Sequence, residues 1–149
     1  MLYRPQFFKL YELICPHVYN KFGDNAWRFF DDEAVVTLDW IRRTLGKPMT
    51  VNNWHDGGRF DERGLRCIQC SIVKDKCLSG QVYVSPHILG KAFDCDIQGM
   101  DASEVRVWLA LNKTKLPYPI RVENHVNWLH FDVEDMGVPL YLFEPWHYR

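Results

Sequence analysis

The sequence lacks an excess of charge of either sign. Eighteen basic residues stand against 19 acidic ones, so the formal net charge is −1. Nothing in this balance attracts the chain to nucleic acid or to an anionic membrane, and we expect neither partner. The first twenty residues lack the features of a signal peptide, and no later stretch is long and apolar enough to span a bilayer. We therefore expect a protein that is cytoplasmic as made. If its substrate lies outside the cell, another component must deliver the protein to it.

The sequence also lacks an even, regularly spaced set of cysteines. It has five: Cys15, Cys67, Cys70, Cys77 and Cys95. Such a set does not indicate the disulfide framework of a small secreted scaffold, and reduced thiols are the default interpretation. Cys67-x-x-Cys70, with Cys77 seven residues later, could hold a structural zinc ion, with Cys95 or a histidine as fourth ligand. Packing of these cysteines within a loop is the alternative.

No internal repeat or low-complexity linker divides the chain. With 149 residues, of which 47% are apolar, it suits a single domain over residues 1–149. Interspersed helices and strands without regular alternation indicate an α+β fold.

Capping residues and periodicity place the individual elements. Asp31 or Asp32 caps a predicted helix over residues 32–45, which Gly46 ends, and Asp101 with Glu104 forms a capping box for a second helix. The remaining predicted segments are a strand over residues 49–54, a long loop over 53–80, and a terminal hairpin with strands at 120–123 and 126–133 around a turn at 124–125.

Two segments carry potential metal ligands in or beside strands. The first is Ser-Pro-His-Ile-Leu-Gly-Lys-Ala-Phe-Asp (85–94), and the second is Asn-Trp-Leu-His-Phe-Asp (127–132). In extended backbone, Asp94 shares a face with Ala92, and His130 shares one with Asp132. If both faces line one cleft, two imidazoles and a carboxylate converge, which is a ligand set of catalytic zinc sites.

The pattern Ser-x-His-x-x-Gly-x-Ala-x-Asp, followed by Trp-x-His-x-Asp, resembles the signature of the zinc D-Ala-D-Ala carboxypeptidase family. That family includes bacterial dipeptidases, phage L-alanyl-D-glutamate endolysins and, by fold, the hedgehog signalling domain. The resemblance covers residues 8–135. It implies a small, mostly antiparallel sheet with flanking helices, a Zn²⁺ cofactor held by His87, Asp94 and His130, and a peptidoglycan peptide as substrate.

The resemblance leaves the catalytic base open. Many relatives carry an acid three residues before the last histidine ligand, where this chain has Asn127. An amide cannot accept a proton from water at neutral pH. Glu123, His125 and Asp132 are the nearby substitutes, although Asp132 also suits a role in orienting His130.

The family commonly holds a substrate carboxylate with an arginine after its first strand. Of Arg59, Arg63 and Arg66, the last two are the better candidates, with solvated side chains as the alternative. Ser85 resembles a family serine near the substrate's carbonyl or carboxylate, or it makes only a loop hydrogen bond.

These features predict a zinc metallopeptidase, a hydrolase that cuts peptidoglycan stem peptides as a D,D- or L,D-type carboxypeptidase or endopeptidase. A phage or bacterial cell-wall-lytic enzyme, either virion-borne or released to the wall, fits this expectation. The alternative, motivated by Asn127, is a non-catalytic metal-binding module of the same fold.

Overall fold

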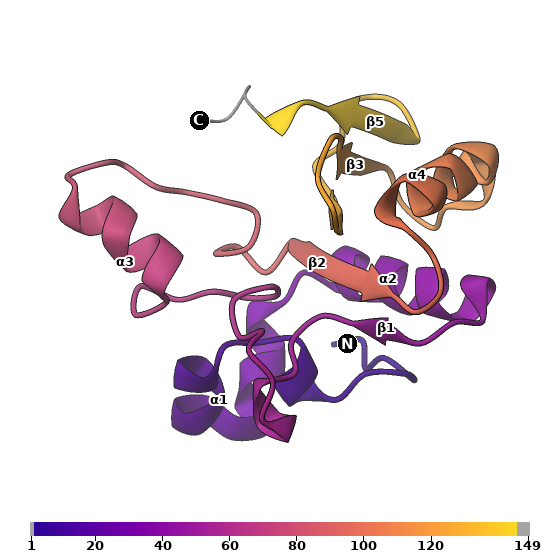
Figure 1. Cartoon of the computed structure of the whole chain (residues 1–149). Coiled ribbons are helices and arrows are strands. Elements are labelled where there is room, and N and C mark those ends of the chain that lie inside the picture. The colour runs from indigo at the N-terminus through magenta and orange to yellow at the C-terminus, as the bar shows by residue number, and fades with distance from the viewer. Residues whose placement is uncertain (1, 146–149) are drawn as a thin grey trace.

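The computed structural model describes residues 2–145, which form an α+β fold (Figure 1). Its α-helices are α1 (Pro16–Phe22), α2 (Asp32–Leu45), α3 (Ser71–Leu78) and α4 (Ala102–Leu111), and its strands are β1 (Met49–Thr50), β2 (Ala92–Ile97), β3 (Ile120–Glu123), β4 (Leu129–Asp132) and β5 (Leu140–Phe143). Short 3₁₀ helices cover Leu10–Glu12, Gly23–Phe29, Trp54–Asp56 and Lys113–Lys115. Among the described helices, none has the length and apolar composition needed to cross a membrane.

The five strands form one mixed sheet in the order β1-β2-β4-β3-β5. The first three pairings in this order are antiparallel, and only β3 and β5 run parallel. The expected α+β class with a mostly antiparallel sheet is therefore confirmed.

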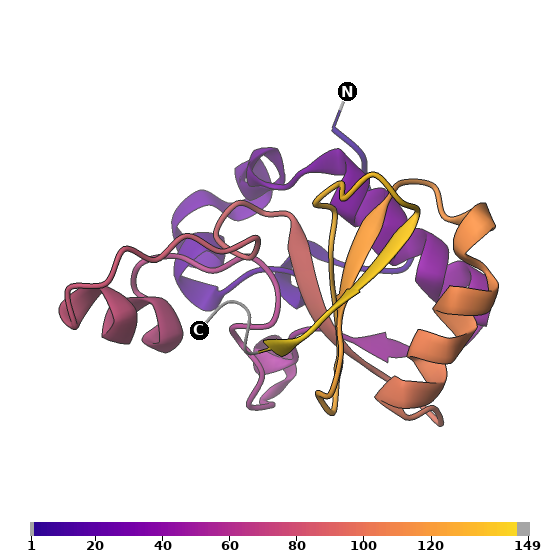
Figure 2. The same ribbon diagram turned by 90° about the horizontal axis from the view of Figure 1, so that it is seen from above.

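Helices α2 and α4 have the boundaries that their capping residues predict. The Asp31 carboxylate accepts a hydrogen bond from the backbone N–H of Glu33, and Gly46 ends α2 in a left-handed conformation with φ 65°. Asp101 and Glu104 form the predicted capping box of α4. Both helices contact the sheet, α2 at β2 and α4 at β4 (Figure 2), and bury apolar side chains there, including Leu38 of α2 and Leu109 of α4.

Several predicted boundaries are wrong. The region 53–80, expected to be loop, contains α3, whose one buried residue, Val73, gives too weak an apolar period to reveal a helix. The strand expected over 49–54 ends at Thr50 and gives way to a 3₁₀ turn. The last hairpin strand spans only Leu129–Asp132, and the unpredicted β5 lies at the sheet edge with Tyr141 and Leu142 exposed.

A buried carboxylate ties the N-terminal segment to α2. Asp39 is 2% exposed. It accepts hydrogen bonds from the Tyr3 hydroxyl at 2.7 Å and from the backbone N–H groups of Gln6 and Phe7 at 3.1 Å. The Tyr3 phenol keeps its proton over a wide pH range, because burial and the bond to Asp39 raise its pKa to about 12.

We expect Asp39→Ala to lower the free energy of unfolding by about 2–4 kcal/mol, because it leaves these donors without their acceptor. Urea titration followed by circular dichroism measures the change. Glu33→Ala, an exposed substitution on the same helix, should change it by less than about 1 kcal/mol. Equal effects of the two substitutions would contradict an anchoring role for Asp39.

Candidate metal centre

The pairing of β2 with β4 sets two potential ligands opposite each other. Asp94 is the register partner of His130, and Phe93 is the partner of Phe131. Since side chains alternate along a strand, both phenylalanines enter the core while Asp94 and His130 share the other face. Both polar side chains are only 7% exposed.

The third potential ligand, His87, comes from the turn that precedes β2. Ser85 opens this turn, since its carbonyl accepts hydrogen bonds from the backbone N–H groups of Ile88 and Leu89. Gly90 closes it with φ 70°, where any side chain would collide with the carbonyl oxygen of Phe29. The Gly90 carbonyl in turn accepts from the N–H of Asp31, which fixes the turn against the start of α2.

The three side chains converge on one point. One ligand atom from each of His87, Asp94 and His130 lies within 4.8 Å of the others. Nδ1 of His130 is 2.8 Å from Oδ1 of Asp94, and Nε2 of His87 is 3.3 Å from Oδ2 of the same carboxylate. Tetrahedral zinc with bonds of about 2.0–2.1 Å separates its ligands by about 3.3 Å, which the distance between His87 and Asp94 matches. The shorter contact between His130 and Asp94 is a hydrogen bond and would have to lengthen to admit an ion.

Hydrogen bonds fix which nitrogen of each histidine is available. Nδ1 of His87 lies 2.9 Å from the carbonyl oxygen of Gly64, which only accepts, so Nδ1 carries the proton and Nε2 offers its lone pair to the cluster. Nε2 of His130 donates likewise to Asp132 at 3.2 Å, leaving Nδ1 for a metal. Partners of this kind orient metal-binding histidines and increase their basicity.

Behind His130, Asp132 is fully buried and paired with Arg121. The guanidinium donates to both carboxylate oxygens, at 2.8 and 3.0 Å. Burial would raise the pKa of Asp132, but the hydrogen bonds from His130 and Arg121 outweigh it and hold the pKa below its usual value. Asp132 thus presents a fixed negative charge to the far side of the His130 ring.

The protonation states of the cluster follow from burial and neighbouring charges. Burial lowers the pKa of His87, which favours the neutral imidazole that a metal needs. For His130, burial alone would lower the pKa, but the hydrogen bonds to Asp132 and Asp94 raise it to about 9. Asp94 stays ionised, because His87 and His130 overcome the effect of burial and lower its pKa.

Asp94 opens into a cleft of about 510 Å³ that carries three arginines. Arg66 donates to Oδ2 of Asp94 at 3.2 Å and to the carbonyl of Glu62. Arg63 is held by both oxygens of Asp96, at 2.8 and 2.9 Å. Arg59 is exposed, with its guanidinium over the Phe60 ring.

A second hollow of about 550 Å³ adjoins this cleft, because Asp96, Asn127 and Trp128 line both.

The remaining predicted site residues lie outside the ligand cluster. Asn127, at the position where many relatives carry an acid, lines the same cleft as Asp94. His125 is 63% exposed in the turn between β3 and β4 and lies 3.4 Å from Glu144, whereas Glu123 ends β3 and pairs with Phe143 in β5. Ser85 does not line the cleft within residues 2–145; its hydroxyl accepts from the N–H of Ile88, as the loop-bond alternative describes.

Two supporting residues were missed in the sequence, Gly64 and Arg121. A side chain at Gly64 would collide with the Leu13 carbonyl, and this close packing brings the Gly64 carbonyl to His87. Arg121 contacts Asp132 because the two are register partners across β3 and β4. The signal available was an arginine in an otherwise apolar strand, which needs a buried counter-ion.

Asp132→Asn should weaken zinc binding by about 10- to 100-fold, because it removes the charge that orients and polarises His130. Competition with a fluorescent zinc chelator measures the affinity. Asp135→Asn is the matched control, since Asp135 is exposed three residues along the chain and should leave the affinity unchanged. Equal affinity in the Asp132 variant and the wild type would contradict this role.

The chain has no match in comparisons with known proteins. No family model, no curated protein and no solved structure matches the chain. The function must therefore be inferred from the chemistry of the centre and its cleft.

Proposed function

We propose that the chain is a zinc-dependent peptidase that cleaves peptidoglycan stem peptides. The observation that supports this most is the convergence of His87, Asp94 and His130 beside an arginine-bearing cleft. Two histidines and one carboxylate leave a fourth position for water or substrate, as catalytic zinc sites do. The resemblance of the two ligand segments to the zinc D-Ala-D-Ala carboxypeptidase family supplies the substrate class, and with it the hedgehog-like fold type and the cell-wall-lytic role in a phage or bacterium.

The chain's own residues account for binding and orientation. When bound, zinc would supply a Lewis acid for the scissile carbonyl and would make a water molecule more acidic, with a pKa near 7 in favourable sites. Arg59, the exposed arginine of the cleft, can bind a substrate carboxylate. Arg63 already donates to Asp96 and would have to divide its hydrogen bonds between Asp96 and the substrate. The two adjoining hollows, both lined by Trp128, offer room for a peptide that extends past the cut bond.

The supply of a base is the distinctive feature of this site. Asp132 is enclosed behind His130 and bound to Arg121, so it orients the ligand and does not face the cleft. The carboxylates that line the cleft besides Asp94 are Asp61, Glu62 and Asp96, and Glu62 already accepts bonds from Ser71 and Ile72. Since Asn127 stands where many relatives carry the acid, we expect the rate of peptide cleavage to be limited by the lack of a base at this position.

The first test is release of peptides from purified peptidoglycan. We expect His87→Ala to reduce release by at least about 10³-fold, because the metal and its water are lost. His55→Ala, an exposed histidine that stacks on Tyr11, should retain full release. Equal release by the His87 variant and the wild type, with zinc content measured alongside, would refute the peptidase proposal.

The second test introduces a carboxylate at position 127, in the cleft that Asp94 lines. Asn127→Glu should raise the rate constant for peptide release by about 10²-fold or more at neutral pH, because a positioned base typically contributes that much. Asn127→Gln matches the size of glutamate without its basicity and should give no increase. An equal response to the two substitutions would mean that the base is supplied by another residue.

Asn127 also supports one second candidate, a metal-binding module without catalysis. Stoichiometric zinc binding by a wild-type protein that releases no peptide, together with strong binding of intact stem peptides, would favour it over the peptidase.

A further inference from the structure

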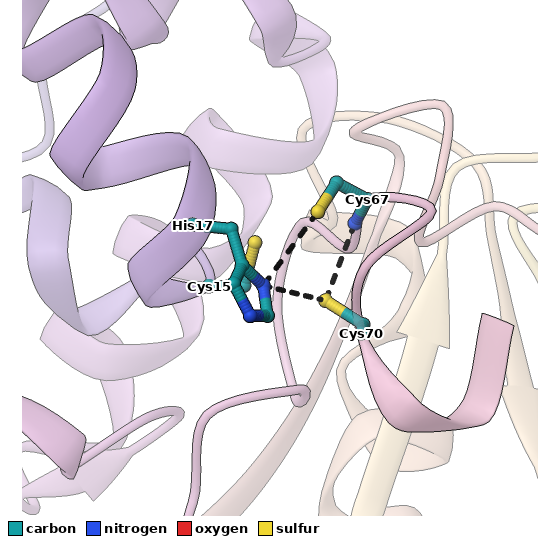
Figure 3. A group of neighbouring side chains, drawn as sticks. All are labelled: Cys15, His17, Cys67 and Cys70. Carbon is teal, nitrogen blue, oxygen red and sulfur yellow. Dashed lines mark hydrogen bonds between the residues drawn. The ribbon is translucent and has the colours of Figure 1, made fainter. Parts of the chain in front are cut away.

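A second group of potential metal ligands lies where the N-terminal segment meets the loop before α3 (Figure 3). Cys15 precedes the first turn of α1, and His17 lies within that turn. Cys67 comes from the loop, and Cys70 precedes the first turn of α3. Of the partners expected for the Cys67-x-x-Cys70 pair, Cys77 is exposed on α3 and Cys95 is buried in the core, and neither belongs to this group.

Backbone pairing holds the two halves of the group together. The N–H of Cys15 donates to the carbonyl of Leu65 at 3.1 Å, and the N–H of Leu65 donates to the carbonyl of Leu13 at 2.9 Å. These bonds form a short parallel bridge between Ile14 and Leu65. Residues 50 or more positions apart in the sequence are thereby brought side by side.

The side chains have the spacing of a tetrahedral site. One ligand atom from each of Cys15, His17, Cys67 and Cys70 lies within 4.8 Å of the others. Nδ1 of His17 is 3.7 Å from Sγ of Cys67 and 3.9 Å from Sγ of Cys70. Zinc with bonds of about 2.3 Å to sulfur and 2.0–2.1 Å to nitrogen sets such atoms about 3.5–3.8 Å apart.

The turn from Cys67 to Cys70 is arranged to support sulfur as an acceptor. The N–H of Cys70 donates to the carbonyl of Cys67 at 3.0 Å, which closes the turn. Two further backbone N–H groups point at sulfur: that of Cys67 toward Cys70 Sγ at 3.3 Å, and that of Gln69 toward Cys67 Sγ at 3.4 Å. Backbone N–H groups in these positions can partner thiolate sulfur, which is the form that binds metal.

We propose that Cys15, His17, Cys67 and Cys70 bind a structural zinc ion, separate from the metal centre at His87, Asp94 and His130. Three thiolates and one imidazole form a complete Cys₃His set with no open position, as in structural zinc sites. Thiolate-rich tetrahedral ligands select zinc over the oxygen-seeking cations Mg²⁺ and Ca²⁺.

The position of α3 gives this ion a mechanical role. The helix projects from the body of the molecule (Figures 1 and 2), and Val73 is its one buried residue. Apolar packing of this extent fastens a helix only weakly. Ile72, in the first turn, lines the same cleft as Asp94. Zinc at Cys70 would therefore fasten one wall of that cleft to the N-terminal segment.

Metal counting on the full chain tests the proposal. After reconstitution with zinc and removal of excess, we expect two zinc ions per wild-type chain by mass spectrometry of the metal. His87→Ala and Cys67→Ser should each retain one, and the double variant none. Cys77→Ser, in the exposed thiol on α3, should retain two. One ion per wild-type chain that is lost in His87→Ala, or two ions in Cys67→Ser, would overturn the second site.

Spectroscopy keeps the test valid if Cys67→Ser does not fold. X-ray absorption on zinc-loaded His87→Ala, whose cysteine cluster is intact, should show mainly Zn–S bonds of about 2.3 Å. Cobalt in this variant should give a strong thiolate charge-transfer band. Absence of sulfur from the zinc shell, or a Cys67–Cys70 disulfide found by thiol counting, would refute the site without bearing on peptidase activity.

Discussion

The antiparallel register of β2 against β4 is the constraint on which the candidate metal centre depends. It sets Asp94 opposite His130 on one face and Phe93 opposite Phe131 on the other. A shift of one residue would turn the carboxylate into the core and bring a phenyl ring to the cleft. Because the two rings pack with the buried side chains of α2 and α4, the same contacts that form the core also hold the ligands in place.

Buried charge is balanced in layers around this pairing. Arg121 neutralises Asp132, Asp132 faces one nitrogen of His130, and Asp94 faces the other. Each group alone would be costly to bury, and removing one would leave its neighbour uncompensated. A cation between Asp94 and the two imidazoles would replace the proton on Nδ1 of His130, which otherwise points at Asp94. The arrangement therefore could hold a metal ion without leaving any of these charges uncompensated.

The sequence predicts what depends on local patterns and misses what depends on distant partners. The limits of α2 and α4 follow from caps such as Asp31 and Asp101, and the alternation after Gly90 correctly placed Asp94 opposite the core side chains. Helix α3 is not predicted because it buries only Val73, so its sequence shows too weak a period of apolar residues to indicate a helix. Likewise, Cys15 and His17 meet Cys67 only because the Ile14–Leu65 bridge brings them together, and no spacing rule connects positions so far apart.

The stretch from Gly64 to Cys67 touches both clusters within four residues. Its Gly64 carbonyl orients His87, its Arg66 side chain contacts Asp94, and Cys67 belongs to the sulfur-rich group. This stretch is therefore a short covalent link between the two clusters. Two ions bound at its ends would behave as heterotropic ligands of one another, and thermodynamic linkage requires that each change the affinity of the other by the same factor.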